Sequence, residues 1–426
     1  MRRHPHKEQR EQLTDKVAAI VLAGGEGTRL YPLTQSRCKP AVSFGGCYRL
    51  IDIPISNAIN ARLRNIFVLS QYLANSLHQH ISETYRLDPY QGSIIEMLSP
   101  EEREGEKVWY EGTADAVRKN LKHLLSFPID YYLILSGDQL YNMDLQSLLS
   151  FAKEHDADLT IATLPVGKEE ATRMGLMQIN DQDKIVDFAE KPTDPEVLEK
   201  FTMPHDKEHY LGSMGIYVFK RKALEDLFES CEGCDFGKHL IPEQIKRGGT
   251  YAYLYKGYWE DIGTIASYYD ANLALTTHSL ALDLYDETNP IYAHPTHLPA
   301  PVIENAQVND SVISQGCVIE AQEISHSIIG PRSDIGAGTV ISDSIVIGNQ
   351  FYVPPQSQIT SLPSQFKIGK NCRIEKAIID EHTQIGDNVT LTNKENLDTY
   401  DSDLVYIRNG IIVVPSGTVI PDNFSL

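Results

Sequence analysis

The chain lacks the excess of basic residues that nucleic-acid binders carry and the long apolar runs of membrane proteins. Its 38 lysines and arginines are outnumbered by 58 aspartates and glutamates, which gives a formal net charge of −20 over 426 residues. So acidic a chain argues against a nucleic-acid partner, because nucleic-acid binders usually carry a basic surface. No apolar run approaches the roughly 20 residues of a membrane span. The first sixteen residues also lack the apolar core of a signal peptide. We therefore expect no membrane partner and a reduced, cytoplasmic setting, or the equivalent inside an organelle.

Cysteine is scarce and scattered. Of the six cysteines, only Cys231 and Cys234 have C-x-x-C spacing. A single such pair without a histidine cluster is weak evidence for zinc. The acidic neighbours Glu229, Glu232 and Asp235 favour a solvated loop instead, and the role of the two thiols stays open.

From residue 17 to about residue 275, short apolar strands alternate with amphipathic helices. The predicted strands are Val17–Leu22, Ile66–Ser70, Tyr131–Leu135, Asp158–Leu164 and Ile216–Phe219. The predicted helices are Thr113–Leu125, Leu145–His155 and Ile265–Leu275. This alternation predicts an α/β domain with a mostly parallel sheet, in which ligands bind at the carboxyl ends of the strands.

The rest of the chain has a different rhythm. Residues 276–300 carry three prolines and read as a linker, and residues 1–16 read as a flexible extension. From residue 301 to residue 426, aliphatic residues recur about every six positions: Val302, Val308, Val312, Val318, Ile324, Ile329 and Ile335. This period predicts a parallel β-helix, interrupted by a proline-rich loop at 349–366; the alternative is a β-sandwich.

A glycine-rich turn follows the first predicted strand. Gly24, Gly25 and Gly27 would let the backbone approach an anion closely, and Arg29 and Lys39 would supply positive charge. The segment matches neither the dinucleotide fingerprint nor the P-loop. The glycines alone fit a plain tight turn equally well; the added cations favour a nucleotide phosphate site.

Two acids and one lysine complete the candidate chemistry. Asp138 follows a predicted strand beside a glycine, and Asp261 lies between aromatic residues and another glycine. Both are placed to hold Mg²⁺, which prefers carboxylate and phosphate oxygens; the alternative for Asp138 is a turn or helix-cap role. Pro192 should hold Lys191 extended, which suits a cation presented into a cleft or a solvated turn.

Together these motifs resemble the glucose-1-phosphate adenylyltransferase (ADP-glucose pyrophosphorylase) family, most closely its plant and cyanobacterial members. The resemblance runs from about Val17 to the C-terminus. It is carried by the glycine-rich start and by the segments Lys39–Val42, Tyr48–Asp52, Trp109–Val117, Ser136–Asp138, Phe188–Pro192, Ser213–Phe219, Asp235–Lys238, Tyr258–Thr264 and Tyr406–Gly410. It implies a Rossmann-like nucleotidyltransferase domain followed by a left-handed parallel β-helix.

The resemblance also implies a role for each matching residue. The nucleotide would be bound by Gly24, Gly25, Gly27, Thr28, Gln71, Trp109, Tyr110, Gly112 and Thr113. Glucose 1-phosphate would be bound by Glu190, Lys191, Ser213, Asp235 and Lys238. Arg29, Lys39 and Asp138 would be catalytic, and Asp138 and Asp261 would hold Mg²⁺.

The implied reaction joins ATP and glucose 1-phosphate into ADP-glucose and diphosphate, for glycogen or starch synthesis. A phosphate oxygen already ionised attacks the α-phosphorus in line, so alignment and charge neutralisation suffice without a general base. This agrees with an inventory of cations, acids and glycines. The family also implies a homotetramer, anionic effectors, and a plastid location if the source is a plant.

The chain departs from the family's effector pattern. Lys394 matches one of two effector-binding lysines, but Pro415-Ser416 stands where the other is expected. Loss of one of two cations should weaken anion binding by about 1–2 kcal/mol, so we expect weak or absent activation by 3-phosphoglycerate. Glu26 replaces an arginine of bacterial members, and no cysteine precedes Cys38.

Three other functions stay open on the sequence. They are a pyrophosphorylase for another nucleotide, a non-catalytic regulatory subunit, and an acyltransferase built on the β-helix. The presence of Asp138, Arg29 and Lys39 argues against the regulatory subunit. The absence of an obvious histidine pair argues against the acyltransferase.

Overall fold

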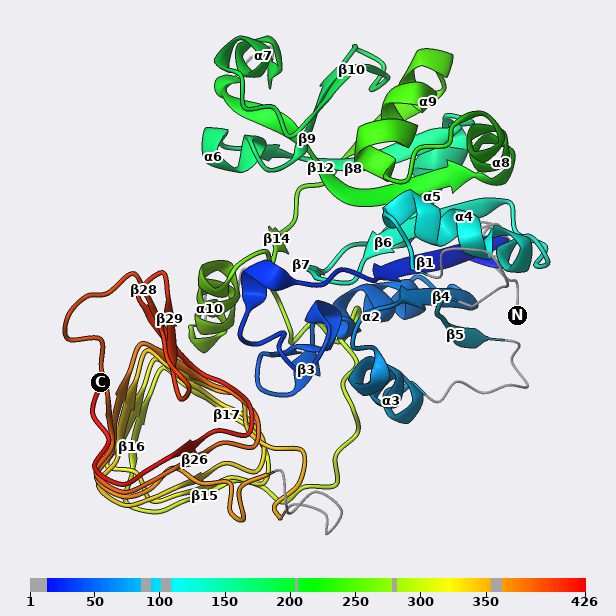
Figure 1. The fold of residues 1–426 in the computed structure, drawn as a ribbon. Coiled ribbons are helices and arrows are strands. Elements are labelled where there is room, and N and C mark those ends of the chain that lie inside the picture. The colour runs from blue at the N-terminus through cyan, green and yellow to red at the C-terminus, as the bar shows by residue number, and fades with distance from the viewer. Residues whose placement is uncertain (1–13, 86–92, 101–108, 204–205, 278–281, 354–361) are drawn as a thin grey trace.

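The computed structural model describes residues 14–85, 93–100, 109–203, 206–277, 282–353 and 362–426. An α/β domain forms the N-terminal part, and a β-helix of triangular cross-section forms the C-terminal part (Figure 1). Most of the predicted N-terminal extension lies outside the described residues. No helix within the described ranges is long and apolar enough to cross a bilayer.

The central sheet of the first domain is parallel around β1 and antiparallel further out. Strand β1 (Val17–Ala23) pairs in parallel with β4 (Asn65–Ser70) and β6 (Tyr131–Ser136), and β5 (Ile94–Leu98) extends the parallel part. On the other side of β6, the long strand β12 (Asp206–Lys220) runs antiparallel to it. The remaining strands of this sheet are β8 (Leu159–Val166), β9 (Gly175–Ile179), β10 (Ile185–Glu190), β11 (Thr202–Met203) and β13 (Thr250–Leu254).

The helices form as the apolar spacing predicts. The three predicted helices are α4 (Thr113–Leu124), α5 (Leu145–Glu154) and α10 (Ile265–Leu273). The Asp144 side chain caps α5, and Thr264 forms a capping box with Ser267 at α10. The other helices are α2 (Asp52–Asn60), α3 (Asn75–Thr84), α6 (Lys168–Ala171), α7 (Pro195–Lys200), α8 (Arg221–Ser230), α9 (Ile241–Arg247), and the short turns η1 (Thr28–Leu30), η2 (Lys39–Ala41), η4 (Phe236–Leu240) and η5 (Ala274–Thr276).

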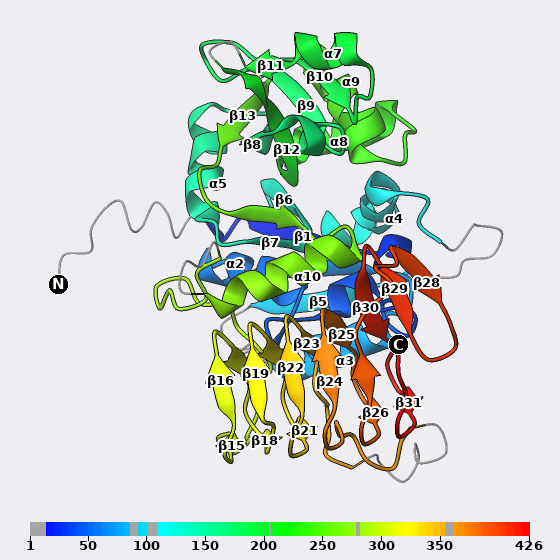
Figure 2. The same ribbon diagram turned by 90° about the vertical axis from the view of Figure 1, so that its left-hand side faces the viewer.

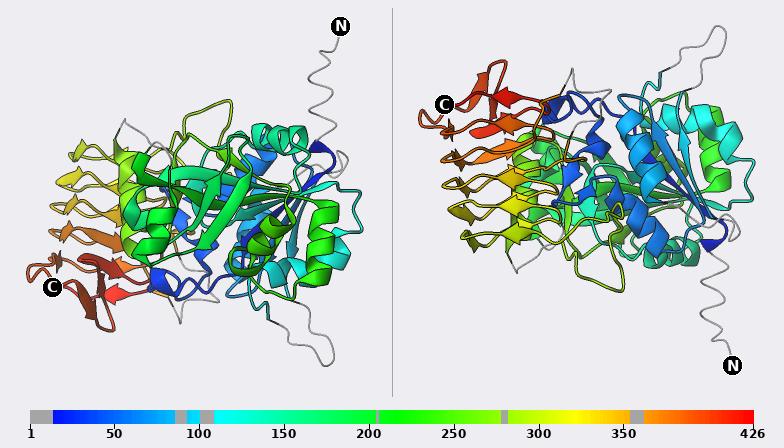
Figure 3. Two further views of the ribbon diagram at one scale, coloured as in Figure 1. Left: turned by 90° about the horizontal axis from the view of Figure 1, so that it is seen from above. Right: turned by 90° about the horizontal axis from the view of Figure 1, so that it is seen from below.

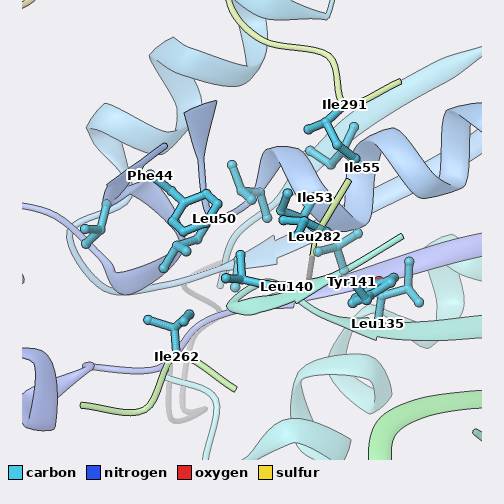
Figure 4. Packing of buried hydrophobic residues seen from close by; sticks show 14 of the residues in the cluster. Phe44, Leu50, Ile53, Ile55, Leu135, Leu140, Tyr141, Ile262, Leu282 and Ile291 are labelled. Carbon is cyan, nitrogen blue, oxygen red and sulfur yellow. The ribbon is translucent and has the colours of Figure 1, made fainter. Parts of the chain in front are cut away.

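A two-stranded ribbon brings distant parts of the chain to the edge of the parallel strands. Strand β7 (Gln139–Tyr141) follows β6 after a tight turn and pairs antiparallel with β14 (Trp259–Asp261), which places Asp261 opposite Gln139. Leu140 and Ile262 anchor this ribbon in the core (Figure 4). A second small ribbon joins β2 (Ser43–Phe44) to β3 (Tyr48–Arg49).

The segment between the two domains contributes to the same core. No helix or strand lies between Thr276 and Val302 in the part of the chain that the structure describes. Leu282 and Ile291 nevertheless pack with Ile53 and Ile55 of α2 (Figure 4). The segment that connects the two domains is therefore held against the α/β domain by apolar contacts.

The C-terminal domain is the predicted parallel β-helix, and the alternative of a β-sandwich is wrong. Val312 pairs with Ile328, and Ile328 pairs with Ile345, so each coil stacks on the last (Figure 2). Its strands are β15 (Val302–Ile303), β16 (Gln307–Asn309), β17 (Val312–Ile313), β18 (Val318–Ile319), β19 (Glu323–Ser325), β20 (Ile328–Ile329), β21 (Asp334–Ile335), β22 (Val340–Ser342), β23 (Ile345–Val346), β24 (Arg373–Glu375), β25 (Ala377–Ile379), β26 (Gln384–Ile385), β27 (Thr390–Leu391), β28 (Thr399–Asp401), β29 (Tyr406–Arg408), β30 (Ile411–Val414) and β31 (Val419–Ile420).

Some aliphatic residues of the six-residue rhythm are exposed. Val302 and Val308 belong to the first coil and are 49 % and 36 % exposed, because that coil has a neighbour on one side only. Val318 is also exposed, and its neighbour Ile319 fills the interior instead. Within a two-residue strand, side chains alternate between the faces, so the period alone does not say which of two adjacent aliphatics is buried.

The two domains share one hydrophobic core. Helix α10 lies between the α/β domain and the β-helix (Figures 1 and 3). Ile328, Ile345 and Ile378 of the β-helix belong to the same buried cluster as Phe44 and Tyr268 of the α/β domain. The domains are therefore packed together and not merely tethered.

A buried ion pair crosses this boundary. An Arg37 Nη2 lies 2.8 Å from Asp380 Oδ1, and Nη1 lies 3.0 Å from Glu381 Oε1. The Arg37 side chain is only 5 % exposed. Ser43 Oγ also donates a hydrogen bond to Glu381. Because the three charges are withdrawn from water, each depends on the others for compensation.

Replacing Arg37 should therefore cost far more stability than breaking a surface ion pair. We expect Arg37→Ala to lower the free energy of unfolding by about 3–5 kcal/mol, because it leaves two buried carboxylates without a cation. Urea unfolding followed by circular dichroism measures the change. The control is Lys16→Ala, which breaks an exposed pair with Asp130 and should cost no more than about 1 kcal/mol. Equal losses in the two variants would contradict the role given to Arg37.

Candidate active site

The glycine-rich loop lies at the carboxyl end of β1 and leads into η1. Gly27 adopts φ +64, a left-handed conformation that favours glycine. A Cβ on Gly27 would lie 2.9 Å from the Cβ of Lys39, so the glycine is also needed for packing. Gly25 differs, since a Cβ there would meet nothing within 4 Å. The protein's own packing therefore does not require glycine at position 25.

Gln71 joins this loop to a second segment. Its Nε2 donates a hydrogen bond of 3.0 Å to the carbonyl of Gly24, and its Oε1 accepts one of 2.8 Å from the backbone N–H of Tyr110. Tyr110 is buried, whereas Trp109 is 59 % exposed. The amide thus holds the glycine loop and the segment before α4 side by side. No local pattern predicts this bridging role, because the two contacts are 47 and 39 residues away.

Asp138 and Asp261 lie together around one lysine. Lys39 Nζ is 2.6 Å from Asp138 Oδ2 and 3.9 Å from Asp261 Oδ1. Ser136 Oγ donates a further hydrogen bond to Asp138. The β7–β14 ribbon makes this meeting possible, and the N–H of Ile262 donates to the carbonyl of Asp138. The predicted proximity of the two acids is present, and their direct pairing with Lys39 was not anticipated.

The two carboxyls have opposite electrostatic surroundings. Burial opposes ionisation of Asp138, but the charge and hydrogen bond of Lys39 outweigh it and lower the pKa of Asp138. Burial raises the pKa of Asp261, and the negative charge of Asp138 adds to this rise. Arg29 and Lys191 act in the opposite direction on Asp261. Lys39 therefore favours the charged form of Asp138, whereas the surroundings of Asp261 disfavour its charged form.

Arg29 approaches the same pair. A Cβ on Gly263 would lie 3.6 Å from Arg29 Nη2 and 3.3 Å from Asp261 Oδ2. Arg29 itself is exposed on η1. The guanidinium therefore lies at the open side of the site, next to the acids.

A second cluster faces the end of β10. The Lys191 ammonium lies 3.8 Å from Glu190 Oε1. Burial raises the pKa of Glu190. The charges of Lys191 and Lys238 act to lower this pKa, and the charge of Asp235 acts to raise it. Ser213 lies on β12 beside an irregularity in its pairing with β8, at the left-handed Gly215. All five residues expected on the sugar side thus fall on elements around one end of the outer sheet.

The backbone at Lys191 is not extended as Pro192 predicts. Lys191 adopts φ +48, in the left-handed region, and its N–H donates to the carbonyl of Met174. That hydrogen bond and the abrupt end of β10 outweigh the steric preference for an extended residue before proline. A left-handed lysine stores strain of about 1–3 kcal/mol, as residues that are held in place at functional sites often do.

Asp235 has a structural role as well. Its side chain accepts a hydrogen bond of 3.0 Å from the N–H of Lys238, which caps η4, and one of 3.2 Å from Thr113 Oγ1. Thr113 is the first residue of α4, on the nucleotide side. Asp235 therefore ties the two halves of the site together.

Glu260 lies next to Asp261 in β14. Burial, with the nearby charges of Glu170 and Asp261, raises the pKa of Glu260 to about 7. Lys394 lies exposed after β27 of the β-helix, far in sequence from these clusters.

Comparison with known proteins agrees with both domains. Residues 18–278 match the family described as nucleotidyl transferase, and residues 296–424 match the GLGC left-handed parallel β-helix domain. The chain is 40 % identical over 444 aligned positions to the glucose-1-phosphate adenylyltransferase small subunit, chloroplastic/amyloplastic, of Triticum aestivum. The alignment covers 97 % of this chain and 93 % of the wheat protein. The chain belongs to the glucose-1-phosphate adenylyltransferase family.

As a member of the glucose-1-phosphate adenylyltransferase family, the chain is a nucleotidyltransferase with an α/β domain and a left-handed parallel β-helix. The resemblance inferred from the motifs is thereby confirmed. The two matched domains also account for nearly the whole chain, so the clusters around Asp138 and Lys191 lie within the nucleotidyltransferase part.

The two loop glycines should respond differently to substitution. Gly27→Ala should lower the free energy of unfolding by about 1–2 kcal/mol, because alanine is strained in the left-handed region, and its Cβ would also press on Lys39. Gly25→Ala should unfold like the parent but raise the KM for ATP about tenfold or more, because the methyl group occupies the space of the phosphates. Urea unfolding and steady-state kinetics measure the two effects. A Gly25→Ala variant with unchanged KM would show that no phosphate approaches this backbone.

Proposed function

We propose that the protein joins ATP and glucose 1-phosphate to form ADP-glucose and diphosphate, in glycogen or starch synthesis. The observation that carries the proposal is the group of Asp138, Asp261 and Lys39 at the end of the parallel strands, beside the glycine loop. Family membership supports the same reaction. The group supplies the charges that transfer between phosphates requires.

Asp138 and Asp261 would hold a Mg²⁺ ion. The donor set fits, because the two carboxylates share one ammonium group and magnesium prefers carboxylate and phosphate oxygens. When bound, the ion would neutralise charge on the phosphates. Lys39 would then be released from Asp138 toward the substrate, since the acids would no longer depend on it.

The nucleotide would lie over the glycine loop. Gly24, Gly25 and Gly27, with Thr28, would face the phosphates, and Arg29 at the open side would balance their charge. Gln71 keeps this loop beside the segment from Trp109 to Thr113, which would border the base. The exposed Trp109 ring is available for stacking on the adenine.

Glucose 1-phosphate would lie in the second cluster. Lys191 would bind its phosphate, because it is the cation of this cluster whose charge also acts on Asp261. The Glu190 carboxylate packs against Gly237 and would accept hydrogen bonds from sugar hydroxyls, together with Ser213. Asp235 and Lys238 would complete this side from η4.

Catalysis would rest on alignment and charge neutralisation. The phosphate of glucose 1-phosphate is ionised at neutral pH, so none of the chain's residues needs to remove a proton. Lys191 would orient this nucleophile, and Arg29 and Lys39 would balance the charge that gathers on the transferring and leaving phosphates. Fixed cations in a partly buried site stabilise such a transition state because they need little reorganisation.

We further propose a homotetramer and regulation by small anions. Family membership supports both, and the exposed Lys394 would contribute to an effector site. The lack of a lysine at Pro415-Ser416 supports weak activation by 3-phosphoglycerate. The chloroplastic or amyloplastic name of the wheat relative supports a plastid location if the source is a plant, with the cytoplasm as the alternative.

A direct assay tests the reaction. The purified full chain with Mg²⁺, glucose 1-phosphate and each of the four nucleoside triphosphates should release diphosphate with ATP and form ADP-glucose. Asp138→Asn should lower kcat about 10²-fold or more with little change in stability, because a metal ligand is lost. The control Asp156→Asn alters an acid that is 82 % exposed and should leave kcat unchanged. Preference for another triphosphate, or no turnover in the parent, would overturn the proposal.

The glucose 1-phosphate site has its own test. Lys191→Ala should raise the KM for glucose 1-phosphate about tenfold or more and leave that for ATP nearly unchanged, because a charge-assisted contact to the sugar phosphate is lost. Lys246→Ala, at a lysine that is 75 % exposed on α9, is the matched control. A rise in the KM for ATP alone would show that Lys191 serves the other substrate.

A further inference from the structure

The C-x-x-C pair lies in a loop that none of the roles above explains. Cys231 directly follows α8, and Cys234 directly precedes Asp235. Both thiols are free and partly exposed. Among the described residues, no group of three or more histidines, cysteines or acids is arranged to hold a metal. The described residues therefore give no support to a zinc site at this pair. We consider instead the redox chemistry of two neighbouring thiols.

The loop is fastened to α4 through its carbonyl groups. Arg118 Nη2 donates to the carbonyls of Cys231 and Gly233 at 2.9 and 2.7 Å. The N–H groups of Ala114 and Asp115 donate to the carbonyl of Cys234 at 2.9 and 3.1 Å. The first turn of α4 thus depends on the conformation of the four residues from Cys231 to Cys234.

The fit between the loop and its neighbours leaves little room for movement. A Cβ on Gly112 would lie 2.4 Å from the carbonyl oxygen of Cys234, and a Cβ on Gly233 would lie 2.2 Å from the Cβ of His239. A change in the direction of the loop would therefore displace Gly112 or η4. Gly112 belongs to the proposed nucleotide side of the site, and η4 belongs to the proposed sugar side.

Both substrate sides meet at the end of this loop. Asp235 accepts a hydrogen bond from Thr113 Oγ1, and Thr113 Oγ1 in turn accepts one from the N–H of Phe236. Thr113 belongs to the proposed nucleotide segment, whereas Asp235 and Lys238 belong to the proposed sugar side. The dithiol therefore adjoins the connection between the two halves.

We propose that Cys231 and Cys234 form a reversible disulfide that weakens substrate binding; as a regulation of this site, the inference rests on the proposed function. A thiolate of one cysteine attacks the disulfide of a dithiol–disulfide exchange protein, and a mixed disulfide forms with loss of one partner thiol. The second cysteine then displaces the remaining partner sulfur. The two protein thiols lose two electrons and two protons, and the partner disulfide becomes two thiols.

Ring closure would change the loop's hydrogen bonds. A disulfide requires Cβ atoms about 3.5–4.5 Å apart and a fixed dihedral angle about the sulfurs. We expect closure of this four-residue ring to alter the backbone that presents the carbonyls of Cys231 and Cys234 to α4. The hydrogen bond between Thr113 and Asp235 would then be displaced, and both substrates would lose preorganised contacts.

The test uses the full chain with glutathione as the redox buffer. On raising the oxidised fraction, the peptide that contains both cysteines should lose about 2 Da, the mass of two hydrogens. The KM for glucose 1-phosphate should rise about tenfold, as expected for a displaced binding partner. Dithiothreitol should restore both values.

Single substitutions decide between this pair and the other cysteines. Cys231→Ser and Cys234→Ser should each retain their reduced KM under oxidation, whereas Cys47→Ser, at the exposed cysteine, should respond like the parent. A KM that rises equally in Cys231→Ser, a peptide that carries bound glutathione without an internal disulfide, or an internal disulfide with unchanged KM would each overturn the proposal. The mass measurement does not need enzyme activity. Absence of ADP-glucose synthesis by the reduced protein would instead count against the proposed function.

Discussion

The ammonium group of Lys39 lies between the carboxylates of Asp138 and Asp261, and the surrounding strands are arranged to keep these three groups together. Asp138 comes from the turn after the central strand β6, and Asp261 is the last residue of the distant strand β14. The β7–β14 ribbon brings the two acids together. The negative charge of Asp138 raises the pKa of Asp261, and the positive charge of Lys39 acts in the opposite direction on both carboxyls.

Lys39 is itself held from the other side of the molecule. Arg37, two residues earlier, is buried against Asp380 and Glu381 of the β-helix. The intervening Cys38 is fully buried, and Lys39 begins the rigid turn η2. The segment that carries Lys39 cannot shift relative to the β-helix without separating buried charges, which is costly. The β-helix therefore helps to position Lys39, a residue of the proposed active site.

Much of this arrangement was predictable from the sequence, and the limits have physical reasons. The spacing of apolar residues predicted β1, β4, β6 and the helices α4, α5 and α10, because this pattern is set by residues close together in the chain. The six-residue aliphatic period predicted the β-helix. The motif resemblance supplied the site residues, which stay predictions. The antiparallel course of β12, the pairing of Lys39 with Asp138, and the bridging amide of Gln71 were not foreseen. Each depends on contacts between residues far apart in the chain, which no local pattern records.

The errors are equally instructive. Lys191 was expected to be extended before Pro192, but a tertiary hydrogen bond to Met174 holds it in the left-handed region. Val302, Val308 and Val318 fitted the aliphatic period and are nevertheless exposed. In both cases a sound local preference was outweighed by the position of the residue in the whole molecule.

The hydrophobic cluster that spans both domains limits how the chain can be divided. Cutting the connection near residue 290 would bare Phe44 and Tyr268 on one fragment and Ile328, Ile345 and Ile378 on the other. Apolar faces of that kind tend to associate when they meet water. The fragments would aggregate or recombine with each other, so insertions and fusions are better placed in exposed loops than at the apparent border between the domains.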